Sequence, residues 1–443
     1  MEITDSRFYL DPSFLKEQCD TLLSKGLLLD SSAYSIAAQW LDQILHFEAP
    51  FDTRPILNVA IGYLMIGDFV QSEKWFGFVL HHEPKNAIAL MNLGAILTQT
   101  NRKHQGAELL DTAYKIQRLF IEPVEAPSRK LLILSLGKVA ANIPLFPLLS
   151  LGRSLNIKYA FDYGNSDEDA QLPDFDIVFN AIGEADFLSP FAPRILELSY
   201  RYQKPLLNHP QAVINTQRHQ LRSTLQHIHN LVLPNYLRFP SLEYADFPLE
   251  AISQQGLDYP IIIRPEGTHG GDGLNIVHQP SELSDIAASF TSFFYIANFI
   301  HYQSADTYFR KYRVIFVDRV PYFYHLAISS HWLVHYYSSE MLNHPWKIQE
   351  EKDFLYSPES VLGEAGMKTL LEIGQSLNLE YVGIDFGIMP DRSLVIFEAN
   401  PTMLIHFENI SGPLAYKNEF VKNIIQAFED MLNRLSPPPQ YVG

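Results

Sequence analysis

Three polar side chains lie in the 381–400 segment, YVGIDFGIMPDRSLVIFEAN, where the surrounding pattern is apolar. Asp385 falls in the first apolar run, and Glu398 and Asn400 fall in the second, beyond a Pro-Asp turn. Glu398 and Asn400 are two positions apart, so on one strand their side chains point to the same face. An antiparallel partner strand would place Asp385 opposite them. Oxygen donors of this kind suit Mg²⁺, which takes one or two carboxylates together with phosphate oxygens and water. The alternative, a solvated sheet face, fits poorly with their apolar neighbours.

A glycine-rich segment could approach phosphate. YPIIIRPEGTHGGDGLNIV (259–277) is expected to form a strand, a loop and a second strand. The loop contains four glycines: Gly267, Gly270, Gly271 and Gly273. Glycine lets backbone N–H groups come close to phosphate and adopts positive φ without strain. Arg264, at the end of the first strand, adds a fixed positive charge. The spacing is not that of a Walker loop, which needs Gly-Lys-Ser/Thr at the start of a helix.

Composition limits the classes of protein to consider. The chain has 443 residues, for which about three domains are expected. Hydrophobic residues make up 47% and charged residues 19%, which is not a disordered composition. The formal net charge of −17 argues against nucleic acid as a partner, because nucleic-acid-binding proteins usually present a basic face. The single cysteine, Cys19, excludes an internal disulfide framework and a multi-cysteine zinc site.

The N-terminal stretch and the lengths of the apolar runs predict where in the cell the protein is found. The N-terminal stretch MEITDSRFYLDPS has no basic segment followed by an apolar core, so we expect no signal peptide. The longest apolar runs, LLILSL and IPLFPLLSL, are too short to span a bilayer. We therefore expect a soluble cytoplasmic protein with no membrane partner.

The N-terminal part, residues 1–125, is predicted to be helical and repetitive from about residue 13 to 120. The segment 56–84 aligns with 90–118 at a spacing of 34 residues. Small residues recur at this period: Ala60 and Gly94, Ser72 and Gly106 and, one unit earlier, Gly26 and Ala38. The period resembles that of tetratricopeptide repeats, which are stacked pairs of antiparallel helices that offer a concave face for peptides. The alternative is an ordinary helical bundle.

Two further regions follow the helices. Residues 128–210 alternate strands and helices, as a parallel α/β sheet does, but carry no G-x-G-x-x-G after the first strand. Residues 211–435 hold the candidate chemistry, with one helix expected over 214–231 and a hairpin over 311–329. Residues 436–443, the Pro-rich end, are expected to be frayed.

Three segments resemble, in order, those of ATP-grasp ligases, the superfamily of glutathione synthetase and D-alanine–D-alanine ligase. They are IIIRPEGTHGGDGL, KYRVIFVDRVPYFYHLA and GIDFGIMPDRSLVIFEANP. The resemblance covers roughly residues 130–430 and implies ATP and Mg²⁺ (two ions, with Mn²⁺ as an alternative). The predicted architecture is multidomain: an all-α repeat region, an α/β pre-ATP-grasp domain and an α+β ATP-grasp domain.

The resemblance also implies residue roles around the transferred phosphate. Asp385 would bind one Mg²⁺, Glu398 would bridge two, and Asn400 would bind the second. Arg313 matches an arginine that family members place near the transferred phosphate. Lys311 would share its strand face, although a solvated surface lysine is the alternative.

The resemblance places the nucleotide on other residues. Arg218 and Arg264 stand where the family has lysines that contact the nucleotide, so the charge is kept but its geometry differs. The adenine hinge would be 294–300, with Tyr295, Asn298, Phe299 and Ile300. It contains no acidic residue, so Asp306 is the nearest candidate for the ribose.

One aromatic segment has two possible roles. Residues 330–352 carry histidines and aromatic residues: His331, His335, Tyr336, Tyr337, His344 and Trp346. In a loop after the hairpin they could line a substrate site or form a packed lid. Their spacing is not that of a zinc site.

The expected activity is ATP-dependent ligation of a carboxylate to an amine or related nucleophile through an acyl phosphate. The acceptor would be a peptide or protein bound by the repeats; dimerisation through the repeats is the alternative. Two other functions stay open: a nucleotide-binding repeat scaffold without catalysis, and kinase-like phosphate transfer on the same core.

Overall fold

A computed structural model of the chain describes residues 53–122, 124, 126–137, 141–150, 152–241, 252, 254–268 and 270–436. The expected earlier helical unit with Gly26 and Ala38, as well as Cys19 and the tail beyond residue 436, lie outside the described residues. The chain divides into two compact units. The first comprises Met1–Phe120, Leu136–Val139 and Lys158–Asn165, and the second comprises Ile121–Ser135, Ala140–Ile157 and Ser166–Gly443.

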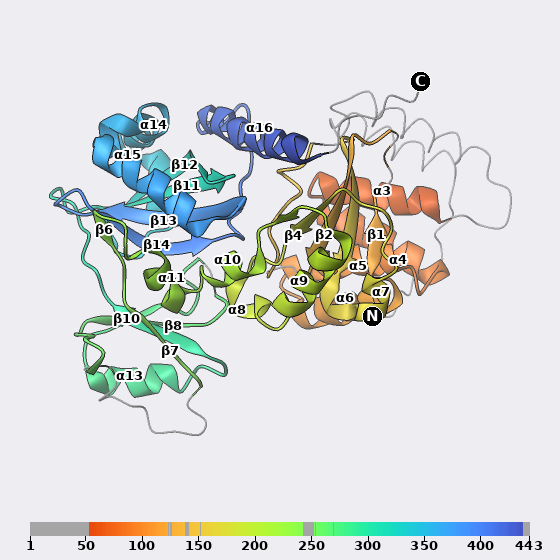
Figure 1. The fold of residues 1–443 in the computed structure, drawn as a ribbon, viewed down its shortest axis with the longest axis horizontal. Helices are drawn as coiled ribbons and strands as arrows, with labels where there is room; N and C mark the ends of the chain where they lie inside the picture. Colours follow the sequence, from red (N-terminus) through yellow and green to blue (C-terminus); the bar gives the residue numbers. More distant parts are fainter. Residues whose placement is uncertain are drawn as a thin grey trace. The chain divides into compact units, whose positions relative to one another are not determined.

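The described part of the first unit contains successive packed helices (Figure 1). They are α3 (Arg54–Met65), α4 (Phe69–His82), α5 (Ala87–Gln99) and α6 (Lys103–Ile116). Asp68 and Asn86 cap α4 and α5 by accepting from the amides of Gln71 and Ala89. Such caps satisfy backbone donors that the first turn of a helix leaves unpaired. The starts of α4 and α5 are therefore specified by their own sequences.

Small residues let these helices approach closely at the positions that the 34-residue spacing singled out. A Cβ placed on Gly106 would lie 2.6 Å from the carbonyl oxygen of Gly94. Ser72 Oγ donates to the carbonyl of Ala60 at 2.8 Å. The helices are thus as expected, and their membership of the tetratricopeptide class stays a prediction.

The first sheet runs through the α/β region in the order β1-β3-β2-β4-β5. Its strands are β1 (Leu119–Ile121), β2 (Arg129–Ser135), β3 (Ser154–Ala160), β4 (Ile177–Asn180) and β5 (Leu206–Leu207). Its helices are α7 (Ser166–Asp169), α8 (Ala185–Leu188), α9 (Ala192–Tyr202) and α10 (Pro210–Ile214). β4 pairs in parallel with both β2 and β5, as the alternation of strands and helices predicted.

The remainder of the second unit contains two further sheets. One is antiparallel, in the order β7 (Tyr236–Phe239), β10 (Phe294–Asn298), β8 (Ile261–Pro265) and β9 (Asn275–Val277), and is accompanied by α13 (Pro280–Ala287). The other runs β12 (Val320–Ser329), β11 (Phe309–Val317), β13 (Tyr381–Ile388), β14 (Leu394–Asn400) and β6 (Leu231–Val232). β6 alone pairs in parallel, with β14.

Helices connect and cover these two sheets. α11 (Arg218–Leu225) contacts β7 of one sheet and β14 of the other, and lies between them in Figure 1. β12 is covered by α14 (Pro345–Tyr356), α15 (Pro358–Leu377) and α16 (Asn418–Leu435). One apolar core joins α16, β11 and β13 to the first sheet, through residues such as Phe179, Tyr381 and Phe428. The sheet that contains β13 and β14 is therefore held on a packed scaffold.

The prediction of a single helix over 214–231 is wrong in extent. α10 ends at Ile214, Gln217 is extended (φ −52°, ψ 136°), and α11 runs only from Arg218 to Leu225. Thr216 Oγ1 donates to the carbonyl of Val213 at 2.7 Å, and such a local side-chain bond competes with helix continuation. The break makes Arg218 the first residue of α11.

The prediction of a loop over 330–352 is wrong in its second half. Two single 3₁₀ turns, Tyr337–Ser339 and Met341–Asn343, are followed by α14, which begins at Pro345. Proline suits the first helical position because its fixed φ matches the helix and its missing N–H would be unpaired there. Trp346 is therefore helical.

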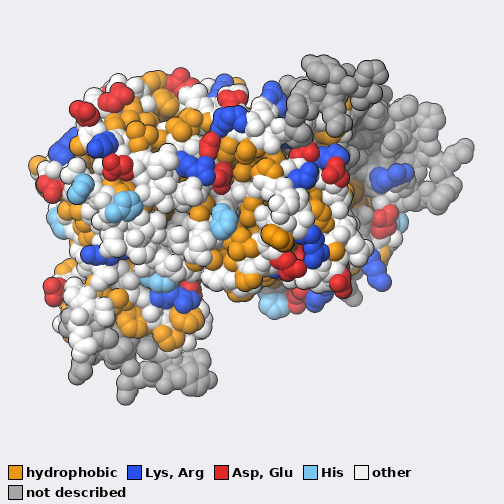
Figure 2. Space-filling model, viewed as in Figure 1, with side chains coloured by type: hydrophobic (Ala, Val, Ile, Leu, Met, Phe, Trp, Pro, Cys, Tyr) orange, Lys and Arg blue, Asp and Glu red, His pale blue; other side chains and the backbone are white. Residues whose placement is uncertain are grey.

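Two surface observations bear on partners. In the parts of the chain that the structure describes, no helix combines the length and the apolar character needed to cross a membrane. On the face drawn in Figure 2, Lys and Arg side chains lie scattered among Asp and Glu.

Candidate functional site

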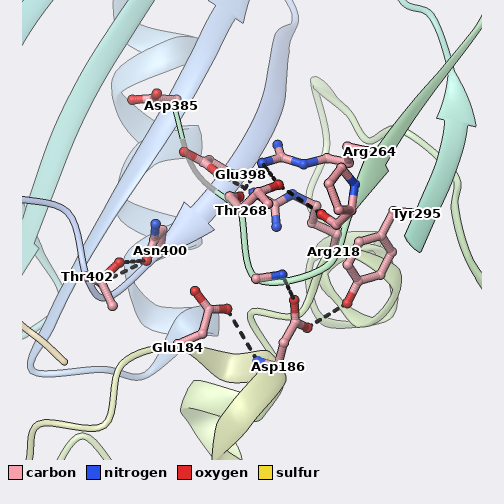
Figure 3. Close-up of polar contacts among 12 residues, drawn as sticks. Glu184, Asp186, Arg218, Arg264, Thr268, Tyr295, Asp385, Glu398, Asn400 and Thr402 are labelled. Carbon is pink, nitrogen blue, oxygen red and sulfur yellow. Dashed lines mark hydrogen bonds and ion pairs between the residues drawn. The ribbon is translucent and has the colours of Figure 1, made fainter. Parts of the chain in front are cut away.

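The pairing of β13 with β14 brings the three polar side chains of the opening segment together. Their antiparallel register places Asp385 across from Glu398 and Gly383 across from Asn400. The register shifts just after Asp385, between Asp385 and Phe386. Figure 3 shows Asp385, Glu398 and Asn400 along these two strands. The predicted common face is confirmed.

Asp385 is buried and bound by two cations from the neighbouring strand β11. Arg313 lies across from Asp385 and donates to both of its carboxylate oxygens, at 2.6 and 2.9 Å. Lys311 Nζ is 3.2 Å from Oδ2, and its side chain is only 17% exposed. Burial by itself would raise the pKa of Asp385, but Arg313 and Lys311 hold that pKa well below its usual range. Asp385 is therefore ionised, and Lys311 lies in the site rather than on a solvated surface.

Glu398 is paired across the gap between the two sheets. Arg218, buried at the start of α11, donates to Glu398 Oε2 at 2.6 Å. Burial disfavours the charge on Arg218, but the Glu398 carboxylate raises its pKa. The ion pair connects Glu398, a candidate metal ligand on β14, to Arg218, a candidate nucleotide-binding residue on α11.

Arg264 is the second buried arginine of this region. It donates to the carbonyl of Thr268 and, at 3.2 Å, to Thr268 Oγ1. Burial and the neighbouring Arg218 guanidinium lower the pKa of Arg264 to about 10, which leaves it charged at neutral pH. Among the described residues, Nε of Arg218 and Nε of Arg264 have no hydrogen-bond partner. Buried donors without partners are costly, and each of these two arginines keeps one.

The glycine loop follows Arg264 and adopts the expected backbone. Its four glycines all have φ between 62° and 79°, where a side chain would be strained. A Cβ on Gly271 would lie 2.8 Å from His335 Nε2. His335, from the aromatic segment, therefore lies beside the loop.

A pocket opens between the start of α8, the start of α11 and the end of β14. It is lined by the donors Glu398 and Asn400, by Arg218, and by residues that the sequence reasoning missed: Glu184, Asp186, Thr216 and Gln217. Its space of about 280 Å³ includes open solvent. Its lining brings carboxylate, amide and guanidinium groups to one place.

A sequence signal for the missed residues did exist. Glu184 and Asp186 follow β4 in the run VFNAIGEADF. Polar residues just beyond the carboxyl end of a buried parallel strand are a common place for ligand contacts. Thr216 and Gln217 gave no such signal, because a single helix was expected there.

Only some of the adenine-hinge candidates lie near Arg218 and the carboxylates. Tyr295 is fully buried and its ring centroid is 6.0 Å from the Arg218 guanidinium carbon. Asn298 accepts from the Asn235 amide at 3.0 Å, and Phe299 packs against Trp332. Ile300 packs on a separate apolar cluster. Tyr295 therefore lies beside Arg218, whereas Asn298, Phe299 and Ile300 contact residues away from the carboxylates.

Asp306 is engaged elsewhere. Arg310 donates to both of its oxygens at 2.9 and 2.7 Å, and also pairs with Glu350 at 2.7 Å. Arg310 alternates with Lys311 on β11, so its side chain points to the opposite face of the strand. The ribose role of Asp306 stays a prediction, and its contacts in this structure do not favour it.

The aromatic segment is divided between core and surface. Tyr336 donates to the buried Glu351 at 2.8 Å, and its ring centroid lies 3.9 Å from Lys417 Nζ. Tyr337 is 86% exposed. His344 lies near Trp346, with ring centroids 6.3 Å apart, and His331 accepts from the Leu333 amide. The segment is neither wholly a lid nor wholly a lining.

The chemistry of the donor set determines whether it fits a metal ion. Within the described ranges, no three His, Cys, Asp or Glu residues converge as an ion site. Asp385, Glu398 and Asn400 offer only oxygen, from two carboxylates and an amide whose Oδ1 also accepts from Thr402. Such a set is too small for an all-protein cage but fits Mg²⁺, which keeps water and phosphate ligands.

Comparison with known proteins adds a set of structural likenesses. No protein-family profile matches the chain, and no curated protein matches it in sequence. The D-alanine–D-alanine ligase of Bacillus anthracis, solved with ATP, is similar with 12% identity and a TM-score of 0.42, over 70% of this chain and 100% of that one. The VanG D-Ala:D-Ser ligase of Enterococcus faecalis has 12% identity and a TM-score of 0.40, over 68% and 99%. The D-alanine–D-alanine ligase of Coxiella burnetii has 10% identity and a TM-score of 0.40, over 69% and 98%. A likeness at this level assigns no activity.

Proposed function

We propose that this protein is an ATP-dependent ligase that joins a carboxylate to an amine, or a related nucleophile, through an acyl phosphate. One observation carries the proposal. The Arg218–Glu398 ion pair links an oxygen-donor set, on β13 and β14, to two buried arginines beside a glycine loop (Figure 3). Cations and oxygen donors close to a glycine loop are what phosphoryl transfer requires, because its catalysis is mostly positioning and charge neutralisation.

The chemical steps follow from that assignment. An acceptor carboxylate attacks the γ-phosphorus of ATP, so an O–P bond forms, the bond to the β-phosphate oxygen breaks, and ADP leaves. The nucleophile then attacks the acyl carbon, so the new C–N bond forms, the C–O bond breaks, phosphate leaves, and the amine proton passes to solvent.

Residues of this chain would bind and orient the charged groups. Arg218 and Arg264 carry donors that can bind phosphate oxygens. Arg313 and Lys311 place positive charge beside Asp385, close to where the acceptor carboxylate and the transferred group would meet. The Arg313 guanidinium gives its two parallel donors to Asp385, so it would act on the transferred group through its charge and through the orientation of that carboxylate.

Asp385, Glu398 and Asn400 would hold Mg²⁺. When bound, the ion would supply electrostatic stabilisation of the charge on the phosphoryl group. How many ions the site takes is part of the proposal, with two expected.

The helical unit suggests that the acceptor is a peptide or a protein. α3–α6 form packed helical hairpins, and stacked hairpins of this kind present extended faces to peptides. We assign the helical unit to acceptor binding, because tethering the acceptor near the site raises its local concentration. Exchange of backbone amides in the full-length protein, with and without the acceptor, tests this: protection should map to 54–116.

Product analysis tests the reaction itself. Full-length protein is incubated with Mg·ATP, hydroxylamine and pools of amino acids and short peptides, and products are identified by mass. A ligase yields ADP, free phosphate and the hydroxamate of its carboxylate substrate. A phosphorylated acceptor without free phosphate would instead indicate kinase-like transfer, and no ADP above the protein-free control would indicate a scaffold. Either of the last two outcomes overturns the proposal.

A further inference from the structure

The α8 segment, residues 183–188, meets the glycine loop although the two are about eighty positions apart in sequence. Asp186 accepts from the amide of Gly267 at 3.2 Å with one carboxylate oxygen. With the other it accepts from the Tyr295 hydroxyl at 2.6 Å. One carboxylate thus connects the first glycine of the loop to the strand β10 (Figure 3).

Neighbouring contacts fix the α8 segment itself. Gln217 Nε2 donates to the carbonyl of Ala185 at 3.2 Å, and Gln217 directly precedes Arg218. A Cβ on Gly267 would lie 2.8 Å from the ring of Phe187. The loop therefore contacts α8 through a hydrogen bond and through ring packing at the same residue.

Tyr295 is the hydrogen-bond donor in its contact with Asp186. Burial and the Asp186 carboxylate raise the pKa of Tyr295 above its usual range, so the hydroxyl keeps its proton and donates. Its ring stacks on His219 at 5.9 Å and faces the Arg218 guanidinium. A shift of Asp186 would therefore reach both the glycine loop and the arginine side of the pocket.

We propose that Asp186 is a positioning residue that holds the glycine loop in its phosphate-accepting conformation, through Gly267 and Tyr295. It binds the amide at the strand end of the loop, and the stretch with Gly270, Gly271 and Gly273 lies beyond that anchor. Ordering a glycine-rich loop before ligand arrives removes an entropic cost from binding. The part of this inference that concerns ATP rests on the proposed function; the part that concerns loop order does not.

The test of loop order uses the full-length protein without ligand. Amide hydrogen exchange over 266–274 is compared for wild type, Asp186→Asn, Asp186→Ala and Tyr295→Phe. Asp285→Asn on the exposed side of α13 is the control, because it makes the same chemical change away from the loop. We expect faster exchange in Asp186→Ala, an intermediate rate in Asp186→Asn, which keeps one acceptor oxygen, and the wild-type rate in the control. Thermal melting of each variant verifies that it is folded, and Tyr295→Phe keeps the test available if Asp186→Ala does not fold.

The test of ligand binding uses Mg·ATP as the probe. Loss of the anchor should raise the Kd for ATP by about tenfold, which corresponds to ~1.4 kcal/mol of lost preorganisation. In steady-state assays KM for ATP should rise while kcat stays near wild type, a split that general loss of folded protein would not produce. The Asp186→Ala and Tyr295→Phe changes should be less than additive, because both break the same contact.

Two results would overturn the inference. Wild-type exchange over 266–274 in folded Asp186→Ala would show that Asp186 does not order the loop. A lower Kd for ATP in Asp186→Asn would show that the carboxylate competes with phosphate instead of preparing its site. If wild type binds no ATP, the proposed function fails, and the exchange comparison still decides the role of Asp186.

Discussion

Two pairs of arginines in this protein differ in how completely their donors are used. Arg310 and Arg313, on β11, form two-pronged ion pairs with Asp306 and Asp385, and Arg310 pairs in addition with Glu350. Arg218 and Arg264 are more deeply buried, yet within the described residues the Nε of each has no partner. A satisfied arginine stabilises or orients what it already touches. A buried arginine with a spare donor gains most from an arriving anion.

The largest expected effect concerns Glu398, the carboxylate that pairs with Arg218. Glu398→Gln should lower turnover by about two to three orders of magnitude, since several kcal/mol of charge stabilisation would be lost at the phosphoryl group. ADP release measures it, and an unchanged melting curve shows that the fold persists. Glu350→Gln is the matched control, because Glu350 pairs with the satisfied Arg310 and should leave turnover intact. Normal turnover in Glu398→Gln would exclude that residue from the mechanism.

The next largest effect should come from removing the metal ion. If Asp385, Glu398 and Asn400 hold Mg²⁺ against phosphate, a chelator should weaken ATP binding by at least about tenfold, because arginines alone leave the triphosphate under-neutralised. Calorimetric titration with Mg²⁺ or with chelator measures the difference. Equal ATP affinity in both conditions would contradict the metal assignment.

Two single substitutions test the comparison itself. Arg264→Met should raise the Kd for ATP by about tenfold, the loss of one charge-assisted contact, with little loss of stability. Arg310→Met should leave ATP affinity unchanged and cost about 1 kcal/mol of unfolding free energy, since its partners are partly exposed. Calorimetry and urea unfolding report both quantities for both variants. The opposite result would show that an unused donor does not distinguish arginines that bind ATP from arginines that only stabilise the fold.

The smallest effect lies behind Arg313. His325 is its cross-strand neighbour, and burial, together with the Arg313 and Lys417 charges, lowers the pKa of His325 well below its usual value. The folded protein therefore keeps His325 neutral while the unfolded chain takes up a proton below about pH 6.5. Stability from this group is present above that pH and falls as pH drops, by up to about 1.4 kcal/mol per pH unit. The urea midpoint of wild type should fall more steeply from pH 7 to 5 than that of His325→Gln. Parallel slopes would assign the pH dependence to other groups.

Several features were accessible from the sequence because they depend on local pattern. The two-residue alternation in 381–400 places Glu398 and Asn400 on one face wherever that strand lies. The glycines of 267–273 adopt positive φ because only glycine does so without strain. The close approach of the helices in 54–116 follows from small residues that recur along the chain.

What the tertiary structure alone decided is which charges meet. Nothing local indicates that Asp385 pairs with Arg313, or that Asp306 pairs with Arg310. The expected helix over 214–231 concealed the turn at Thr216 that makes Arg218 the first residue of α11. Asp186 reaches Gly267 only because the α/β sheet and the glycine loop fold onto one another. Backbone periodicity is a property of neighbouring residues, whereas ion pairing depends on distances between strands that are far apart in sequence.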